Sequence, residues 1–152
     1  MENPAKKLLK SLFEYHHFYN LELDKLLLAD RESAFEKPQQ LFSHMLNAHQ
    51  IWNARLSGEG PFGVFQLHRP EDRAAIDLEN YQKSLSILKE RKLEDWISYA
   101  DSRGHKFRNT VEDILFHITN HHTYHRGQVM MSLREQGAEP LISDYIYYKR
   151  RS

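Results

Sequence analysis

Histidines at helical spacing are the residues of this sequence whose type and spacing could do chemistry. His117, His121 and His125 follow one another every fourth residue within the segment 109–137. An α-helix turns by about 100° per residue, so these side chains share one side of a helix, and neighbours four residues apart can bind one ion. The spacing alone has little specificity, because a chain of 152 residues with ten histidines produces such pairs by chance. Whether this spacing indicates a metal site therefore depends on the helix that carries the three imidazoles.

The segment 109–137 has the signals of a long helix at both ends. Asn109 and Thr110 are candidate N-caps, each followed three residues later by an acidic residue, and Gly137 suits the left-handed position after a helix. Apolar residues recur around the histidines at helical spacing: Val111, Ile114, Leu115, Ile118, Val129 and Leu133. We therefore expect the side of the helix that carries the histidines to face the interior.

Three residues near His125 have expected roles of their own. Gln128 lies close to the histidine stripe and could orient an imidazole, whereas Arg126, about 100° beyond His125, is expected to pair with a carboxylate of another helix or subunit. For both residues a structural hydrogen bond and a catalytic role remain open. Gly127 costs up to about 1 kcal/mol relative to alanine inside a helix, which predicts that a backbone or bulky side chain packs closely there.

A second expected helix, residues 38–56, places one histidine among core residues. His44 lies on a stripe with residues that are mostly apolar: Leu41, Met45, Ala48, Ile51, Trp52 and Arg55. A histidine in such a stripe is either a hydrogen-bonded core residue or a metal ligand, and the spacing does not decide between them. His49 lies about 140° further round the helix from His44 and is expected on the outside.

The remaining segments complete a helical architecture. Residues 4–29 and 70–91 have helical spacing, whereas residues 96–108 alternate around a turn and predict a short β-hairpin. The aromatic loop 60–69 is expected to form a lid or pocket wall, and the tyrosine-rich tail 141–149 to pack on the bundle or on a partner. The sequence therefore predicts an all-α protein, a four-helix bundle with a β-hairpin before the last long helix, in one domain spanning residues 1–152.

Composition narrows the function classes. The chain has no cysteine, which excludes disulfides, thiolate metal ligands and an internal thiol nucleophile. Its 21 basic and 21 acidic residues leave no basic field for nucleic acids or anionic membranes, so neither is an expected partner. With no long apolar run and no leader pattern, we expect a cytoplasmic location.

Three strings go beyond these general patterns. They are LFSHMLNAHQIWNARLSGEGP at Leu41–Pro61, TNHHTYHRGQ at Thr119–Gln128 and SDYIYY at Ser143–Tyr148. In this order, and over nearly the whole chain, the sequence resembles the DinB family of damage-inducible proteins, which is unrelated to the DNA polymerase of the same name. The most specific part of the resemblance is NHHTYHRGQ at Asn120–Gln128.

The resemblance implies a fold and a set of ligands. It implies a four-helix bundle with up-down-down-up connectivity, usually a homodimer, that holds a divalent metal with three histidines. Carried over by position, these ligands are His44, His121 and His125. His117 matches a position that relatives often fill with histidine, and is expected to lie beside the ligands or to be an alternate ligand. His49 stands where relatives tend to have an acidic residue, so it either substitutes in the site or adds to it.

Three neutral imidazoles define the expected chemistry. They suit Zn²⁺ first, with Ni²⁺ or Fe²⁺ as alternatives, and three protein ligands leave an open position as in catalytic zinc sites. Because the family includes bacillithiol-dependent transferases, the resemblance implies an S-transferase acting with an external low-molecular-weight thiol on a small-molecule substrate, or else a metal-dependent hydrolase. The alternative is a non-catalytic stress-response module that binds a ligand or protein and whose metal is structural. The sequence assigns no general base.

Overall fold

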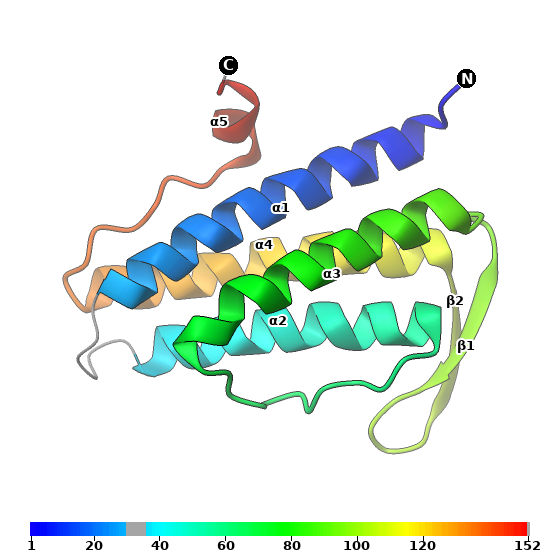
Figure 1. The fold of residues 1–152 in the computed structure, drawn as a ribbon, viewed down its shortest axis with the longest axis horizontal. Coiled ribbons are helices and arrows are strands. Elements are labelled where there is room, and N and C mark those ends of the chain that lie inside the picture. Colours follow the sequence, from blue (N-terminus) through cyan, green and yellow to red (C-terminus); the bar gives the residue numbers. More distant parts are fainter. Residues whose placement is uncertain (30–35, 152) are drawn as a thin grey trace.

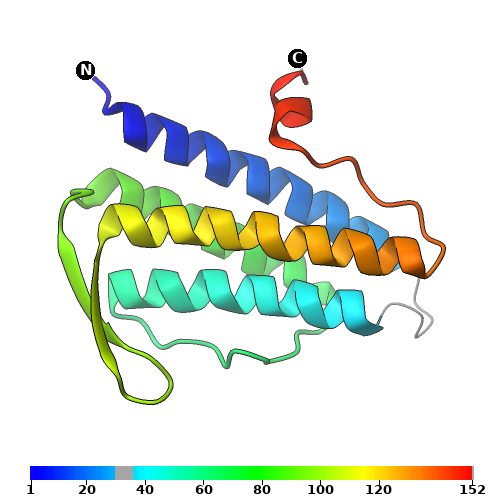
Figure 2. The ribbon, with the colours of Figure 1, turned by 180° about the vertical axis from the view of Figure 1, so that it is seen from behind.

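The computed structural model describes residues 1–29 and 36–151, in which four long helices lie side by side (Figure 1). They are α1 (Pro4–Ala29), α2 (Glu36–Ser57), α3 (Pro70–Glu90) and α4 (Val111–Glu135). Figures 1 and 2 show α2 and α3 running in one direction and α1 and α4 in the other, which is the expected up-down-down-up connectivity. The loop between α2 and α3 returns the chain along the bundle, so that α3 can run parallel to α2. Most of the segment between the first two expected helices, residues 30–35, lies outside the described residues.

A β-hairpin before α4 is present as predicted. It pairs β1 (Trp96–Ala100) with β2 (Lys106–Thr110) in antiparallel register, with Trp96 opposite Thr110. Thr110 ends β2 and caps α4, because its side chain accepts a hydrogen bond from the Asp113 backbone amide while the Asp113 carboxylate accepts one from the Thr110 amide. After α4, Gly137 has a φ of 80°, as expected of a glycine that follows a helix.

The C-terminal tail packs on the bundle. Of the two expected positions for the tail, on the bundle or on a partner, the structure shows the first. It ends in a short helix, α5 (Tyr145–Lys149), set beside α1. The Tyr145 hydroxyl is 3.0 Å from Ser11 Oγ, and the Tyr15 hydroxyl donates to the Ser143 carbonyl oxygen. The Tyr15 ring also meets the rings of Tyr145 and Tyr148.

The bundle has two apolar clusters, one at each end. The cluster near the hairpin contains Leu9, Phe13, Leu56, Ile87, Leu88, Leu93, Val111, Ile114, Leu115 and Ile118. The cluster at the other end contains Leu23, Leu27, Phe42, Met45, Leu46, Val129, Met130 and Leu133. Burial of each large apolar side chain stabilises the fold by roughly 1.5–3 kcal/mol, so these clusters are the main reason that the four helices associate.

Between the apolar clusters lies a set of buried polar side chains, here called the polar layer: His16, Asn20, His49, Asn53, Asn80, Ser84, His122 and Arg126. Part of it is a hydrogen-bonded chain from α2 to α3, in which His49 Nε2 lies 2.7 Å from Ser84 Oγ and Ser84 donates to Asn53 Oδ1 at 2.9 Å. Burying polar groups is costly unless they are paired, so these bonds fix how the helices align.

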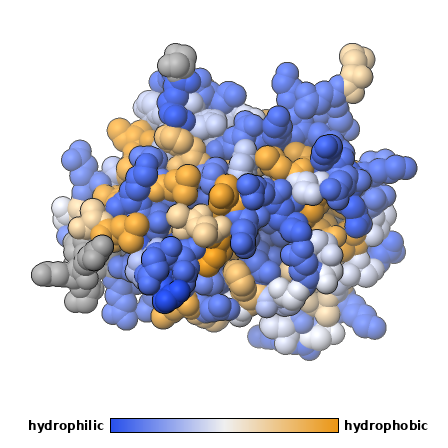
Figure 3. All heavy atoms as spheres, viewed as in Figure 1, coloured by the Kyte–Doolittle hydropathy of each residue, from blue (hydrophilic) through white to orange (hydrophobic). Residues whose placement is uncertain are grey.

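The outer surface of α3 includes the exposed apolar residue Leu78, whereas its inner side carries buried charges. Figure 3 shows hydrophilic and hydrophobic residues mixed on the face of the molecule that carries α3. On the inner side, buried Arg73 donates to Asp24 of α1 at 2.8 Å. Among the described helices, none is long and apolar enough to cross a membrane.

Candidate metal centre

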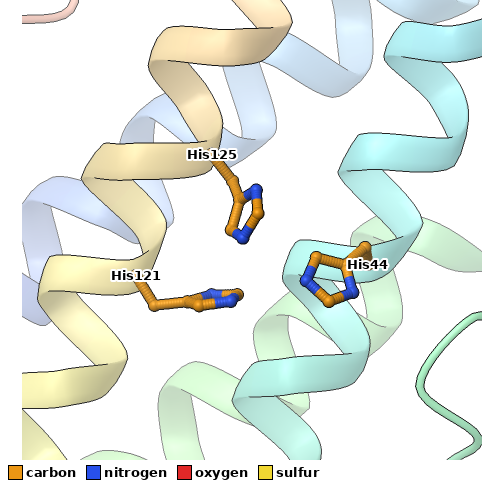
Figure 4. Close-up of side chains that lie close together, drawn as sticks. All are labelled: His44, His121 and His125. Atoms are coloured by element: carbon orange, nitrogen blue, oxygen red, sulfur yellow. The ribbon is translucent and has the colours of Figure 1, made fainter.

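Three imidazoles converge on the seam between α2 and α4. His44 comes from α2, and His121 and His125 come from successive turns of α4 (Figure 4). Each ring offers one nitrogen, and these nitrogens all lie within 4.8 Å of one another. The ring centroids are 5.2 Å apart for His44 and His121, 4.7 Å for His44 and His125, and 4.2 Å for His121 and His125. Such a group could hold one metal ion.

Hydrogen bonds orient two of the three rings. His44 Nδ1 lies 3.4 Å from the Val64 carbonyl oxygen, and His125 Nδ1 lies 2.7 Å from Gln128 Oε1. A carbonyl oxygen only accepts, so each Nδ1 carries the proton and donates it, which leaves the Nε2 lone pair free. This is how ligand histidines are usually held. The expectation that Gln128 orients an imidazole is confirmed.

Burial keeps the rings on α4 neutral. Desolvation, followed by repulsion from His125 and other neighbouring imidazoles, lowers the pKa of His121 to about 3. Desolvation also lowers the pKa of His125, although its hydrogen bond to Gln128 raises it in part. Neutral imidazoles are the form that binds metals, so this donor set is ready for a divalent cation at neutral pH and fits the chemistry of one.

The loop after α2 covers the site from the side of His44. The Phe65 ring stacks on the His44 ring at a centroid distance of 5.9 Å. Asn47, one helical turn after His44, donates to the carbonyl oxygens of Val64 at 3.2 Å and Gln66 at 2.8 Å. The loop therefore forms a wall of the site, as expected. Asn47 was not among the predicted site residues, although its position three residues after His44 was a signal that both residues share a face.

His117 lies beside the group rather than in it. Its ring is 5.7 Å from that of His121 and packs edge-on against Trp52 at 4.9 Å. Desolvation and the charge of Arg55 lower its pKa. The histidine stripe of α4 as a whole lies on the partly exposed seam, since His117 is exposed and His121 and His125 are half-buried. The expectation that this stripe faces the interior was wrong.

A second set of histidines fills the interior instead. His49, expected on the outside, is 4 % exposed and belongs to the polar layer, where its ring meets that of His122 at 5.0 Å. The prediction failed because α2 is covered by α3 as well as by α4, so a side chain 140° from His44 still points into the bundle. His122 was not singled out, although it is spaced four residues from Ile118 and seven from Leu115 on the buried face of α4.

Two further expectations for α4 were wrong. Arg126 is buried and donates to His16 Nδ1 at 3.0 Å, with its guanidinium 4.8 Å from the Tyr15 ring, so it meets an imidazole and an aromatic face rather than a carboxylate. Within the part of this chain that the structure describes, Gly127 has no close neighbour, since a Cβ atom added there would meet nothing within 4 Å.

The fold and the site together define a class of protein: an up-down-down-up helical bundle whose second and fourth helices bring three imidazoles into ligand distance. The model of the DinB family matches residues 15–152, so the chain belongs to the DinB family. The sequence is also similar to Protein DinB of Bacillus subtilis (strain 168), with 23 % identity over 156 residues that cover 90 % of this chain and 91 % of that protein.

Proposed function

We propose that the protein is a metal-dependent enzyme in which His44, His121 and His125 bind one divalent ion. The observation that carries the proposal is the convergence of three ring nitrogens within 4.8 Å of one another, supplied by two different helices. Two of the rings have their Nδ1 atoms engaged by Val64 and Gln128, which leaves Nε2 available. Zn²⁺ is the expected ion, with Ni²⁺ and Fe²⁺ as alternatives of suitable ligand preference.

The surroundings of the triad define the roles of the other residues. A divalent ion bound by three histidines supplies a Lewis acid with an open position, which lowers the pKa of a thiol or water that reaches it. Gln128 holds the His125 ring in position, and Asn47 holds the loop that carries Val64 and Phe65 against His44. This loop limits access of solvent from one side.

Transfer of a thiol group is the reaction we propose. The chain has no cysteine, so the sulfur comes from a low-molecular-weight thiol. The sulfur forms a bond to an electrophilic carbon of the second substrate, the leaving group takes the electron pair of the broken bond, and the thiol proton passes to solvent. Hydrolysis at the same site, with water in place of the thiol, is the related reaction.

We also propose that the chain acts as a single domain in a homodimer. Exposed side chains of Phe116, Tyr124 and Met131 follow one face of α4, with Gly127 between them. These positions fall within an arc of about 80° on a helix, so they form one stripe on which a second copy can pack closely. Light scattering of wild type and Tyr124→Glu tests this, because a charge in the interface gives monomers.

Metal content decides the main proposal. Protein purified without chelators and without nickel resin is expected to hold one divalent ion per chain, measured by elemental mass spectrometry. The variant His125→Ala loses this ion while its circular dichroism remains helical. His117→Ala is the matched control, because it removes a histidine of the same helix that lies outside the group, and it retains the ion. Wild-type protein that holds no ion at neutral pH contradicts the proposal.

A non-catalytic binding module is the second candidate, and the exposed Phe65 favours it. This side chain is 83 % exposed and lies on the loop that covers His44, so it could contact a ligand or a protein. If binding rather than catalysis is the function, the triple variant His44→Ala, His121→Ala, His125→Ala still captures the cellular partner of the wild type. An enzyme instead loses thiol-dependent consumption of electrophiles in this variant.

A further inference from the structure

Arg55, near the end of α2, is a cation whose side chain makes one hydrogen bond among the described residues. Its guanidinium lies 4.2 Å from the centroid of the Trp52 ring and 4.8 Å from that of the Tyr99 ring. One terminal nitrogen donates to the Ala100 carbonyl oxygen at 3.3 Å. Within residues 1–29 and 36–151, Arg55 forms no ion pair. The two rings fix the plane of the guanidinium and leave its other N–H groups for a ligand.

Two acidic residues, Asp101 and Glu59, line the same hollow as Arg55, and both are already engaged. The Asp101 carboxylate accepts hydrogen bonds from the backbone amides of Arg103 and His105, both at 2.9 Å, and lies 3.1 Å from His105 Nδ1. Glu59 pairs with Lys83 Nζ. The negative charge of Asp101 weakens the attraction of Arg55 for an anion without neutralising it, which a substitution can measure.

A groove beside Arg55 reaches Val64, the loop residue whose carbonyl oxygen contacts His44. Its volume is about 360 Å³, within the range of small-molecule sites, and Arg55, Tyr99, Phe62 and Val64 are among the residues that line it. Val64 marks the end near the triad, because its carbonyl oxygen is the one bonded to His44 Nδ1.

Arg55 and His44 lie on one stripe of α2. Arg55 follows His44 by eleven residues, which places the two side chains about 20° apart around the helix axis. Because the guanidinium lies over Trp52, eight residues after His44, the charge is about 12 Å from His44 along the axis. A molecule that contacts both groups is therefore elongated.

We propose that Arg55 anchors the carboxylate of an elongated small molecule whose other end reaches the histidine triad. The inference rests on the proposed function, and it names the substrate class of the same site: a thiol or other metal-binding head joined to a carboxylate by a chain of several carbon atoms. A planar guanidinium binds a carboxylate through two parallel hydrogen bonds, and stacking between rings preorganises it for this.

Matched thiols test the anchor in protein loaded with Co²⁺, in which thiolate binding produces a charge-transfer absorption. The probes are ω-mercaptooctanoate and ω-mercaptooctanol, which differ only in the terminal group, and mercaptoacetate, which is too short to reach Arg55. In wild type the octanoate is expected to bind about tenfold to a hundredfold more tightly than the octanol, as for a hydrogen bond to a charged group. Mercaptoacetate gains no such advantage.

Variants separate the anchor from a structural role. Arg55→Gln is expected to remove the preference for octanoate and to leave octanol binding unchanged, and Asp101→Asn is expected to strengthen octanoate binding. The matched control is Arg108→Gln, which removes an arginine that stacks on Trp96 within the β1–β2 hairpin. This variant is expected to keep the preference for octanoate over octanol. If Arg55→Gln lowers the unfolding free energy but keeps the preference, or if wild type has none, the inference is wrong. Should Arg55→Gln not fold, Arg55→Lys is used, and it is expected to reduce the preference.

A metal-free experiment keeps the two proposals distinguishable. Trp52 and Trp96 are the two tryptophans of the chain, so Trp96→Phe leaves Trp52 as the sole indole reporter beside Arg55. Suberate is expected to change its fluorescence, whereas octanediol is not, and Arg55→Gln removes the response. If suberate changes the fluorescence but thiols give no cobalt–thiolate absorption, only the proposed metal function is contradicted. If the absorption appears but octanoate binds no more tightly than octanol, only the proposed role of Arg55 is contradicted.

Discussion

Mild acid should unfold the metal-free protein through its buried histidines. His16, His49 and His122 are at most 4 % exposed, and desolvation lowers the pKa of each, that of His122 from 6.5 to about 4. The unfolded chain protonates these rings near their ordinary pKa, whereas the folded chain excludes the proton. Their contribution to stability is therefore complete above about pH 6.5 and is lost as the pH falls toward the folded values.

The size of the loss follows from the same values. His122 has a pKa of about 4 in the folded chain and about 6.5 in the unfolded chain. At pH 5 this difference lowers the unfolding free energy of the protein by about 2 kcal/mol. Each of the three histidines contributes up to about 1.4 kcal/mol per pH unit, and together up to about 4 kcal/mol per unit. A domain of this kind has about 5–15 kcal/mol in total, so two pH units reach the unfolding transition.

The variant His49→Gln tests the contribution of one of the three buried histidines to this pH dependence. Glutamine can still donate to Ser84, while the titrating ring is gone, so the slope of unfolding free energy against pH is expected to fall by about 1.4 kcal/mol per unit. The measurement is urea unfolding followed by circular dichroism, with chelator, at several pH values between about 7.5 and 5. The comparison is His105→Gln, at an exposed position of the hairpin, and it is expected to change the slope less than His49→Gln does. Equal slopes for wild type and His49→Gln refute the reasoning.

Three substitutions test the packing around the site by urea unfolding. Arg73→Ala leaves Asp24 buried without its partner and should lower the unfolding free energy by about 3–5 kcal/mol, whereas an effect under 1 kcal/mol contradicts a buried ion pair. Thr110→Ala removes the α4 cap and should cost about 1 kcal/mol, and Thr123→Ala, at an exposed position within α4, is the comparison. In the Tyr124→Glu background, which removes the proposed dimer, Gly127→Ala should stabilise by up to about 1 kcal/mol, because within the described chain the added methyl group meets nothing within 4 Å, and a destabilised variant would reveal a neighbour.

Local patterns predicted the elements well, because the signals that define helices are local. The expected limits 4–29 and 70–91 match α1 and α3 within one residue, and the limits 38–56 match α2 within two. Thr110 and Gly137 fixed the ends of α4 through a side-chain cap and a left-handed backbone, both of which depend on few neighbouring residues.

The spacing of residues along each helix could not predict which faces of the helices are buried. A helical wheel gives the angle between His44 and His49 but not the positions of the neighbouring helices, and α2 is covered on two sides. The loop 60–69 had no period at all, so its expected role as a lid or pocket wall could be placed over His44 only through the bonds of Asn47 to Val64 and Gln66. Likewise, spacing alone related His121 to His125, whereas His44 was added to them by the resemblance to the DinB family, and the packing of α2 on α4 brings the three together.

The interior and the site are coupled through consecutive residues of α4. His121 and His122 differ by about 100° around the helix, so one ring faces the seam and the other faces the polar layer. Two apolar clusters alone would tolerate rotation or sliding of α4, because apolar contacts have little directionality. The bond from Arg126 to His16 is directional, and it holds α4 against α1 in one register. The buried polar groups thus set the rotation of α4 that points His121 and His125 toward His44, although none of them belongs to the triad.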